Sequence, residues 1–355
     1  ATSGLDRQET AAFYDRKNQH PQASLILSAA HDWDLLCQTC QWVTQHPDAF
    51  GATILDVGCD CGLLSCFLAQ TFPHSRITSI DRSANGIHAA QQLAERLGLT
   101  NITFLHTDLE TLPPMEFDTV FSSRTVQENY DPLLENARFL PLTHQGRICA
   151  QVFQRYTSLL CQFVKPGGTF VTVERMERDR VFLGYCLALH SQGLDLVPES
   201  HQELHCQEGD HTTTLQAFCG VKEGRTTPTD AEDFFIATFQ DALTWQPRHL
   251  DVGGELILEL CAQELIRGHF LHNPQGARVG KLAIYTSKFD PEELFYYQGI
   301  LGQPVQVHRL SRGELSDVLA LLETDLATLT ASTLSAHPFS FQDGVELLLE
   351  EMEED

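Results

Sequence analysis

A regular alternation of short apolar runs with amphipathic stretches begins at Thr53 and constrains the fold of this chain more than any other feature. Five runs have the composition of strands: TILDVG, RITSID, ITFLHTD, FDTVFSS and TFVTVER. The stretches between them, such as LLSCFLAQTF and SANGIHAAQQLAERLG, place apolar residues at helical spacing, and Ser83 is a suitable N-cap. Alternating strands and helices are typical of a parallel sheet with crossover helices. The sequence therefore predicts a doubly wound α/β fold with a mainly parallel sheet.

The chain after the fifth strand predicts the end of this sheet and a second domain. ELHCQE and TTLQAFCGVKE predict an antiparallel hairpin that closes the sheet. The polar, proline-containing stretch at residues 226–229 suits a linker. We therefore expect one domain over residues 1–225 and a small acidic α/β or α+β domain over residues 230–355. Within the second domain, KLAIYTS and PVQVHRL predict strands, and DPEELFYYQGIL predicts a helix between them.

The net charge bears on the partners that this chain attracts at long range. It carries 23 basic and 48 acidic residues, which gives a formal net charge of −25. From Thr226 onward, acidic residues outnumber basic ones by 22 to 7. Such a surface repels polyphosphate at long range. We therefore expect no nucleic acid partner, and the acidic last domain either favours a cationic or neutral partner or serves only solubility.

Hydropathy and cysteine content bear on location and on metal binding. No apolar run approaches the roughly 20 residues that cross a bilayer, and the first residues, ATSGLDRQET, lack the basic and apolar blocks of a signal peptide. The 11 cysteines are an odd number without the spacing of a small disulfide scaffold, which favours reduced thiols. Cys37 and Cys40 have no partner pair at zinc-site spacing. We expect a soluble, cytoplasmic protein without membrane contact or metal.

The turn from Gly58 to Gly62 joins the first strand directly to a helix. This junction presents backbone N–H groups and the positive end of a helix dipole at the carboxyl edge of the sheet, where a polar or anionic group docks. Gly58 lets the backbone approach a ligand closely, and Gly62 permits tight packing where the helix begins. Alone, the turn predicts a nucleotide-like ligand.

Acidic residues at the ends of the next two strands narrow this ligand to an adenosine. Asp81 ends the second strand about 20 residues beyond the turn, where a carboxylate can accept hydrogen bonds from both ribose hydroxyls. Asp108 follows the third strand, where a carboxylate can accept a hydrogen bond from an adenine amino group. A dinucleotide dehydrogenase needs no counterpart of Asp108, so the pattern disfavours a nicotinamide enzyme.

Taken in order, the motifs ILDVGCDCG, ITSIDRSANGIHAA, FLHTDLETLPPMEFDTVFSS and VKPGGTFVTVE resemble the class I, Rossmann-like, S-adenosylmethionine-dependent methyltransferase family. The resemblance extends from about Leu25 to Gly224. It implies S-adenosyl-L-methionine as the cofactor and methyl transfer by in-line displacement. In this family the segment before the first helices often folds over the cofactor, so Tyr14 either belongs to such a lid or has a plain packing role.

Carried over by position, the resemblance implies cofactor-binding roles along the same sheet edge. It assigns Asp56, Gly58, Cys59 and Gly62 to the loop around the methionine end, Asp81 to the ribose, Arg82 to the adenine face, Asp108 and Leu109 to the adenine, and Ser122 to the floor of the pocket. One position departs from the family, which most often has a second glycine where this chain has Asp60. The sequence supports two roles for Asp60: binding the ammonium group of the cofactor, or capping the following helix.

The loop after the fourth strand, SRTVQENYDP, corresponds to the substrate-facing loop of the family. If the acceptor needs a general base, Glu128 and Tyr130 in this loop and Glu174 at the end of the fifth strand are the candidate catalytic residues. The alternatives are a solvated position for Glu128 and a packing role for Tyr130. The loop lacks the Asn/Asp-Pro-Pro-aromatic tetrapeptide of methyltransferases that act on the amino groups of bases, which again disfavours nucleic acid.

We therefore predict an enzyme that transfers a methyl group to a small-molecule acceptor. Methylation of a protein with a basic segment is the alternative within the enzyme class, because the last domain is acidic. A non-catalytic adenosine-binding scaffold that acts through its last domain is the alternative outside it. We expect the last domain to cover the acceptor site or to mediate formation of a homodimer.

Overall fold

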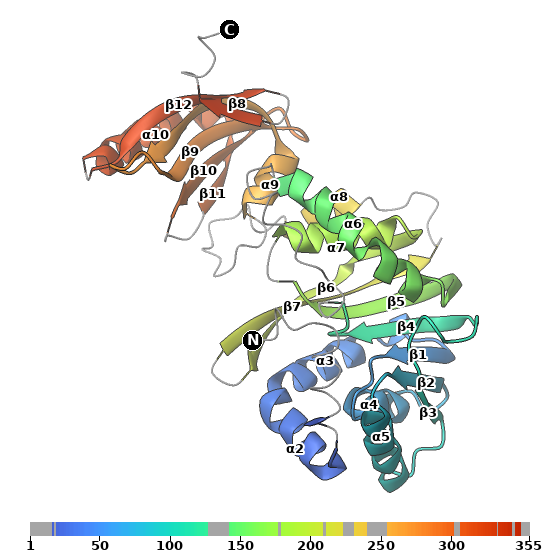
Figure 1. Cartoon of the computed structure of the whole chain (residues 1–355). Coiled ribbons are helices and arrows are strands. Elements are labelled where there is room, and N and C mark those ends of the chain that lie inside the picture. The colour runs from blue at the N-terminus through green and yellow to red at the C-terminus, as the bar shows by residue number, and fades with distance from the viewer. Residues whose placement is uncertain are drawn as a thin grey trace. The chain divides into compact units, whose positions relative to one another are not determined.

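The computed structural model describes residues 16–17, 19–126, 142–176, 179–208, 211–222, 231–239, 254–301, 306–331, 333–342 and 345–348. Backbone contacts divide the chain into two compact units (Figure 1). The first unit lies within residues 1–234, and the second consists of residues 235–355 together with two short segments, 136–146 and 178–180.

The first unit is built on a seven-stranded sheet in the order β3-β2-β1-β4-β5-β7-β6 (Figure 1). Its strands are β1 (Thr53–Val57), β2 (Arg76–Asp81), β3 (Ile102–His106), β4 (Phe117–Ser123), β5 (Val164–Arg175), β6 (Leu194–Glu208) and β7 (His211–Lys222). β1 to β5 run parallel, and β7 pairs antiparallel with both β5 and β6. The predicted doubly wound fold, a mainly parallel sheet closed by an antiparallel hairpin, is confirmed.

Helices cover both faces of this sheet. They are α2 (Pro21–His31), α3 (Trp33–Gln45), the 3-10 helix η1 (Pro47–Ala49), α4 (Leu63–Thr71), α5 (Ala84–Arg96), α6 (Leu142–Cys161), α7 (Asp179–His190) and α8 (Ala231–Phe239). On one face, Trp42 of α3 and Leu68 of α4 belong to a buried cluster with Ala217 of β7. Neighbouring strand residues point to opposite faces, so Phe218 lies on the other face, where its ring packs against Tyr185 of α7. The sheet is therefore buried between two helical layers.

The order of the strands creates a crevice at the carboxyl end of β1. From β1, the chain adds β2 and β3 on one side and β4 and β5 on the other. Val57, the last residue of β1, lies in register with both Ile80 of β2 and Ser122 of β4. Ligands bind at such a switch point in open α/β sheets because the connections leave it in opposite directions. The helix after β2, α5, begins where the sequence predicts. Ser83 is its N-cap, and the Ser83 hydroxyl accepts a hydrogen bond from the Gly86 N–H at 3.1 Å.

The second unit is built on a six-stranded sheet in the order β11-β10-β9-β8-β12-β13, in which every pairing is antiparallel. Its elements are α9 (Gly254–Cys261), β8 (Ala262–His272), β9 (Arg278–Ser287), β10 (Glu293–Ile300), β11 (Gln306–Ser311), the 3-10 helix η5 (Arg312–Glu314), α10 (Leu315–Thr330), β12 (Ser335–Gln342) and β13 (Val345–Leu348). Val318 and Leu322 of α10 pack with Leu282 and Tyr296 on one face of the sheet. This unit is therefore an α+β domain.

One predicted helix of the second unit is wrong. Most of DPEELFYYQGIL forms the strand β10, which pairs with both β9 and β11. Leu294, Phe295, Tyr296 and Tyr297 are all buried, so both faces of the strand are covered and the sequence shows no alternation of polar and apolar residues. Aromatic side chains favour strands, and long-range pairing decided the conformation.

Candidate active site

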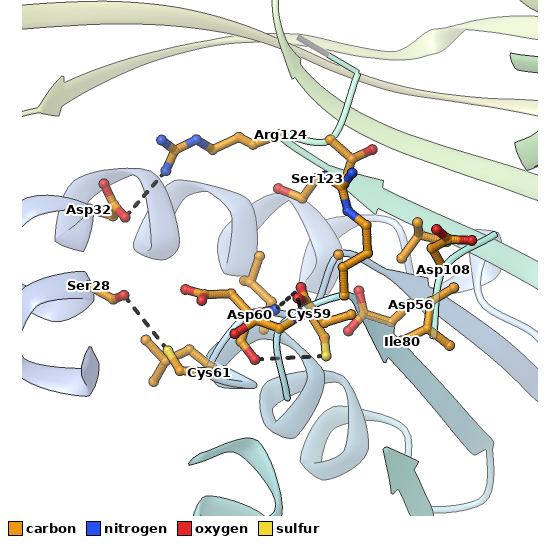
Figure 2. Close-up of a pocket in the computed structure, with 18 of the residues that line it drawn as sticks. Ser28, Asp32, Asp56, Cys59, Asp60, Cys61, Ile80, Asp108, Ser123 and Arg124 are labelled. Carbon is orange, nitrogen blue, oxygen red and sulfur yellow. Dashed lines mark hydrogen bonds and ion pairs between the residues drawn. The ribbon is translucent and has the colours of Figure 1, made fainter. Parts of the chain in front are cut away.

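A pocket of about 1240 Å³ opens at the carboxyl edge of the first sheet (Figure 2). Its wall includes the turn after β1, the ends of β2 and β3, the loop after β4, and parts of α2, α3 and α6. The sequence-predicted residues that line it are Asp56, Gly58, Cys59, Asp60, Asp81, Arg82, Asp108 and Leu109. Gly62 and Ser122 are not among the lining residues. The structure therefore brings most of the predicted cofactor residues together around one cavity.

The two glycines of the turn solve two packing problems. Gly58 has a φ of 74°, and a Cβ atom there would lie 2.6 Å from Cγ2 of Thr125 in the loop after β4. Gly62 has a φ of 82°, and its Cβ would lie 2.5 Å from the Cβ of Ala90 in α5. A side chain at either position is excluded by both the backbone conformation and the overlap. Gly58 thus shapes the pocket, while Gly62 allows α4 to begin against α5.

Four backbone N–H groups of the turn donate hydrogen bonds within the protein. Those of Gly58 and Cys59 donate to the carbonyl of Ile80 at 2.9 and 3.1 Å. That of Asp60 donates to Oδ2 of Asp81 at 2.9 Å, and that of Gly62 donates to the carbonyl of Cys59 at 2.8 Å. These four hydrogen bonds hold the turn to the neighbouring strand and stabilise its conformation.

Carboxylates instead dominate the inner end of the pocket. Asp56 accepts a hydrogen bond from the Ser65 hydroxyl at 2.5 Å, and burial raises the pKa of Asp56 to about 6. Asp81 accepts a second backbone hydrogen bond, from the Ser83 N–H at 2.7 Å, and burial also raises its pKa. Burial penalises an anion, and a bound cation offsets that penalty. This end of the pocket therefore suits a positively charged ligand.

Asp60 adopts an unusual left-handed conformation, with a φ of 45°. Its Oδ2 lies 2.7 Å from Nζ of Lys17, which precedes α2 in the chain. Gly62 is the N-cap of α4, and no side chain caps that helix. The capping role predicted as one alternative for Asp60 is therefore wrong. Sequence reasoning did not single out Lys17, since no local pattern links it to a residue 43 positions away.

The ends of β2 and β3 form the opposite side of the cofactor region. Oδ1 of Asp108 accepts hydrogen bonds from the N–H groups of Glu110 and Thr111, at 2.9 and 3.2 Å. These bonds order the loop after β3 at the pocket wall. Ile80 and Leu109 add apolar surface to the same wall, which suits the faces of a flat aromatic ring such as adenine.

Glu174 holds the loop after β4 from beneath. It is fully buried, and its Oε1 accepts hydrogen bonds from the Thr125 N–H and the Ser122 hydroxyl, both at 3.1 Å. Its Oε2 accepts from the Val126 N–H at 3.2 Å. Burial raises the pKa of Glu174 to about 7. The geometry gives Glu174 a positioning role and no path to an acceptor, and it places Ser122 beneath the pocket wall.

The other two candidate bases, Glu128 and Tyr130, lie outside the described residues, as does Tyr14 of the expected lid. Their predicted roles therefore stay predictions.

Two arginines at the ends of β4 and β5 line the pocket, and sequence reasoning missed both. Arg124 has a φ of 58° and follows β4, with Nη1 3.3 Å from Asp32 Oδ2 and Nη2 3.6 Å from Glu208 Oε1. Arg175, at the end of β5, also pairs with Glu208. Strained residues of this kind concentrate at functional sites. Arg124 could have been found from the sequence, because it lies in the loop SRTVQENYDP that corresponds to the substrate-facing loop of the family. No sequence pattern indicated Asp32 or Glu208.

The residues of this pocket fit S-adenosylmethionine. Buried carboxylates match its sulfonium and ammonium charges, apolar strand-end residues match its adenine, and Gly58 leaves room beside the turn. The fold and this pocket are those of a class I, S-adenosylmethionine-dependent methyltransferase domain. Residues 49–218 match the family model described as a methyltransferase domain, and this part of the chain belongs to that family.

Curated relatives share part of this domain. A ribosomal RNA small subunit methyltransferase G of Chlorobium luteolum is 36% identical over 106 residues, which are 30% of this chain and 42% of the relative. The protein of the same name from Bacillus thuringiensis is 27% identical over 176 residues, which are 50% of this chain and 63% of the relative. The chain thus spans about half the length of the curated relatives that it matches.

Solved structures with a similar fold include magnesium protoporphyrin IX methyltransferase from Synechocystis PCC 6803 with bound S-adenosylmethionine. It is 16% identical with a TM-score of 0.45, and the match covers 62% of this chain and all of that one. The N-methyltransferase NodS from Bradyrhizobium japonicum WM9, in complex with S-adenosylhomocysteine, is 17% identical with a TM-score of 0.42 over 59% of this chain and 98% of that one.

The names of the curated relatives contradict the expectation that nucleic acid is excluded as a partner. Net charge misled here because it sums over the whole surface. The pocket lining alone carries six Lys and Arg residues against seven Asp and Glu residues, so its charge is nearly balanced in a chain of −25. At physiological ionic strength, repulsion between exposed charges is largely screened beyond about 8 Å, and local charges decide contact.

Two further findings concern the described part of the chain. No helix in it is long and apolar enough to cross a membrane. Nowhere in the described residues do three or more His, Cys, Asp or Glu side chains form a group that could hold a metal ion. All 11 cysteines are free thiols, and burial raises the pKa of the pocket residue Cys59 well above its usual range. Cys59 therefore stays a neutral thiol in the pocket wall.

Proposed function

We propose that this chain transfers the methyl group of S-adenosylmethionine to RNA. The names of the curated relatives support an RNA acceptor, which replaces the small-molecule acceptor expected from the sequence. Because the matches cover 42% and 63% of two of these relatives, their activity is only a starting point for this chain.

The arginines on the acceptor side of the pocket carry the proposal. Guanidinium groups form bidentate hydrogen bonds with phosphate oxygens and with base edges, and they keep their charge at any physiological pH. Arg124 is about one third exposed and lines the same pocket as the cofactor residues. Asp32 and Glu208 orient it from two sides. An RNA group that enters the pocket therefore meets a positioned cation beside the cofactor.

Methyl transfer from a sulfonium is an in-line displacement, so the protein mainly aligns donor and acceptor at about 3 Å. The cofactor, when bound, supplies the activated methyl group. Asp56 and Asp81 would hold it by charge and hydrogen bonding, and Asp108 would hold its adenine. Glu174 keeps the loop of Arg124 in place beside it. These residues bind and orient, which is the main requirement of this reaction.

The test is transfer of a labelled methyl group. The chain is incubated with methyl-labelled S-adenosylmethionine and with total RNA, protein or small-molecule extract of the source organism. We expect label in RNA that ribonuclease removes. Label confined to the protein or small-molecule fraction would contradict the proposal.

Arg124→Gln tests the residue that carries the argument. We expect transfer to RNA to fall about tenfold or more, as for loss of a charged hydrogen bond, with binding of S-adenosylhomocysteine unchanged within about twofold. Arg96→Gln, at the exposed end of α5, is the matched control and keeps parental transfer. Equal activity of the Arg124 and Arg96 variants would remove the support that Arg124 provides.

A further inference from the structure

The ion pair between Lys17 and Asp60 places a positive charge directly at the turn after β1. The Lys17 Nζ lies 2.7 Å from Asp60 Oδ2, and the two side chains are 13% and 28% exposed. Both residues line the pocket. A lysine that gives up most of its hydration needs a fixed anionic partner, so Asp60 holds the ammonium group at this point.

The cations of the pocket divide by location. Arg124 and Arg175 pair with Glu208 at the ends of β4 and β5, and Arg155 pairs with Glu110 beyond β3. Arg82 follows Asp81 at the end of β2, on the side that the resemblance assigns to the adenine. At the turn itself, among the carboxylates, the cation in the ion pair given for the described residues is Lys17, which pairs with Asp60. Its neighbour in the chain, Arg16, also lines the pocket but is exposed.

The amino-acid end of S-adenosylmethionine is a zwitterion, and this is the end that the turn would receive. Its ammonium and sulfonium groups suit the buried carboxylate of Asp56, and Asp81, which the resemblance assigns to the ribose, adds negative charge nearby. Its carboxylate would be repelled by the same groups unless a cation lies beside it. The N–H groups of Gly58 and Cys59 do not serve, because they already donate to Ile80. A cationic side chain at this end would offset that repulsion.

We propose that Lys17, oriented by Asp60, binds the α-carboxylate of the cofactor. The segment before α2 thereby recognises the amino-acid end of the ligand, and Asp60 acts on the cofactor through Lys17. This inference rests on the cofactor and is independent of the RNA acceptor.

The test compares two ligands that differ at the amino-acid end. S-adenosylhomocysteine carries the ammonium and carboxylate groups, whereas 5′-methylthioadenosine lacks both. For Lys17→Met we expect calorimetry to show about tenfold weaker binding of S-adenosylhomocysteine, as for loss of a charged hydrogen bond, and binding of 5′-methylthioadenosine within about twofold of the parent. Lys17→Arg, which keeps the charge, should bind both ligands within about threefold of the parent.

Arg16→Gln is the matched control for loss of one positive charge in the same segment. If it weakens the binding of S-adenosylhomocysteine as much as Lys17→Met does, the effect comes from the total charge of the segment. That result would refute a direct contact of Lys17 with the carboxylate. Equal weakening of both ligands by Lys17→Met would show a structural role and also refute it. Tighter binding of S-adenosylhomocysteine to Lys17→Met would mean that Lys17 competes with the cofactor for Asp60, which is the opposite of the proposal.

Discussion

Substitution of Glu174 by glutamine separates a positioning role from a catalytic one. In the parent, both carboxylate oxygens accept hydrogen bonds, two of them from the backbone N–H groups of Thr125 and Val126. Glutamine keeps one oxygen but presents an NH2 group on the other side. One buried N–H then loses its acceptor, which costs about 1 to 3 kcal/mol. We expect Glu174→Gln to be less stable than the parent at low pH by about this amount.

The pH dependence of the free energy of unfolding gives a second, independent estimate of the role of Glu174. Burial raises the pKa of Glu174 from 4.5 to about 7. Because the folded-state pKa is the higher one, the protonated form stabilises the fold, and this stabilisation is lost as the pH rises through about 7. The full effect of such a shift is about 3 kcal/mol, of which about 2 kcal/mol is lost between pH 5.5 and 8.5. Glutamine does not titrate, so the stability difference between variant and parent should shrink by about 2 kcal/mol over this range.

Urea unfolding followed by circular dichroism at pH 5.5 and 8.5 measures both effects. Glu95→Gln, at an exposed position of α5, is the control for the chemical change alone and should unfold like the parent at both pH values. A stability difference for Glu174→Gln that is the same at both pH values would refute the assigned titration. A variant with parental stability and cofactor binding that loses methyl transfer alone would refute the positioning role and restore Glu174 as a base.

Two other substitutions test the cofactor turn. Burial raises the pKa of Asp56 to about 6, and a bound cation favours its ionised form, so affinity for S-adenosylmethionine should rise about fourfold from pH 5 to 7, as for about 1 kcal/mol of charge interaction. Calorimetry of Asp56→Asn checks this, and an unchanged pH dependence in the variant would assign the effect to another group. Gly62→Ala should lower the urea midpoint by the equivalent of about 1 to 3 kcal/mol, because its Cβ overlaps Ala90. Gly98 has a similar φ of 67°, but a Cβ atom there would meet no atom within 4 Å, so Gly98→Ala tests backbone strain alone. Equal losses of stability in both variants would show that backbone strain rather than overlap decides the cost.

The fold of the first unit followed from local patterns. The apolar runs from Thr53 to Glu174 lie in β1 to β5, and the helical spacing between them corresponds to α4, α5 and α6. Buried parallel strands and amphipathic helices differ in length and period, so the alternation is visible without long-range information. In the second unit, the strand β10 was not predicted, because both of its faces are buried and its sequence shows no alternation of polar and apolar residues.

The site divides in the same way. Asp56, Gly58, Asp81 and Asp108 could be placed at one edge because each stands at the end of a parallel strand, and the carboxyl ends of parallel strands meet there. No residue at a strand end, and no motif in the sequence, indicated the identity of the acceptor in the same way. Net charge is a sum over all residues, and it carries no information about which charges line a pocket.

The sequence by itself therefore indicated the class of the methyltransferase domain, the cofactor of that class and the strand ends that line the pocket. Only the tertiary structure decided that Lys17 meets Asp60 across 43 residues and that Arg124 meets Glu208 in the wall of the same pocket. Only it decided that Glu174 turns inward to hold a loop. Strand and helix periods are local properties of the chain, whereas these contacts arise between side chains whose positions are fixed by the packing of separate elements.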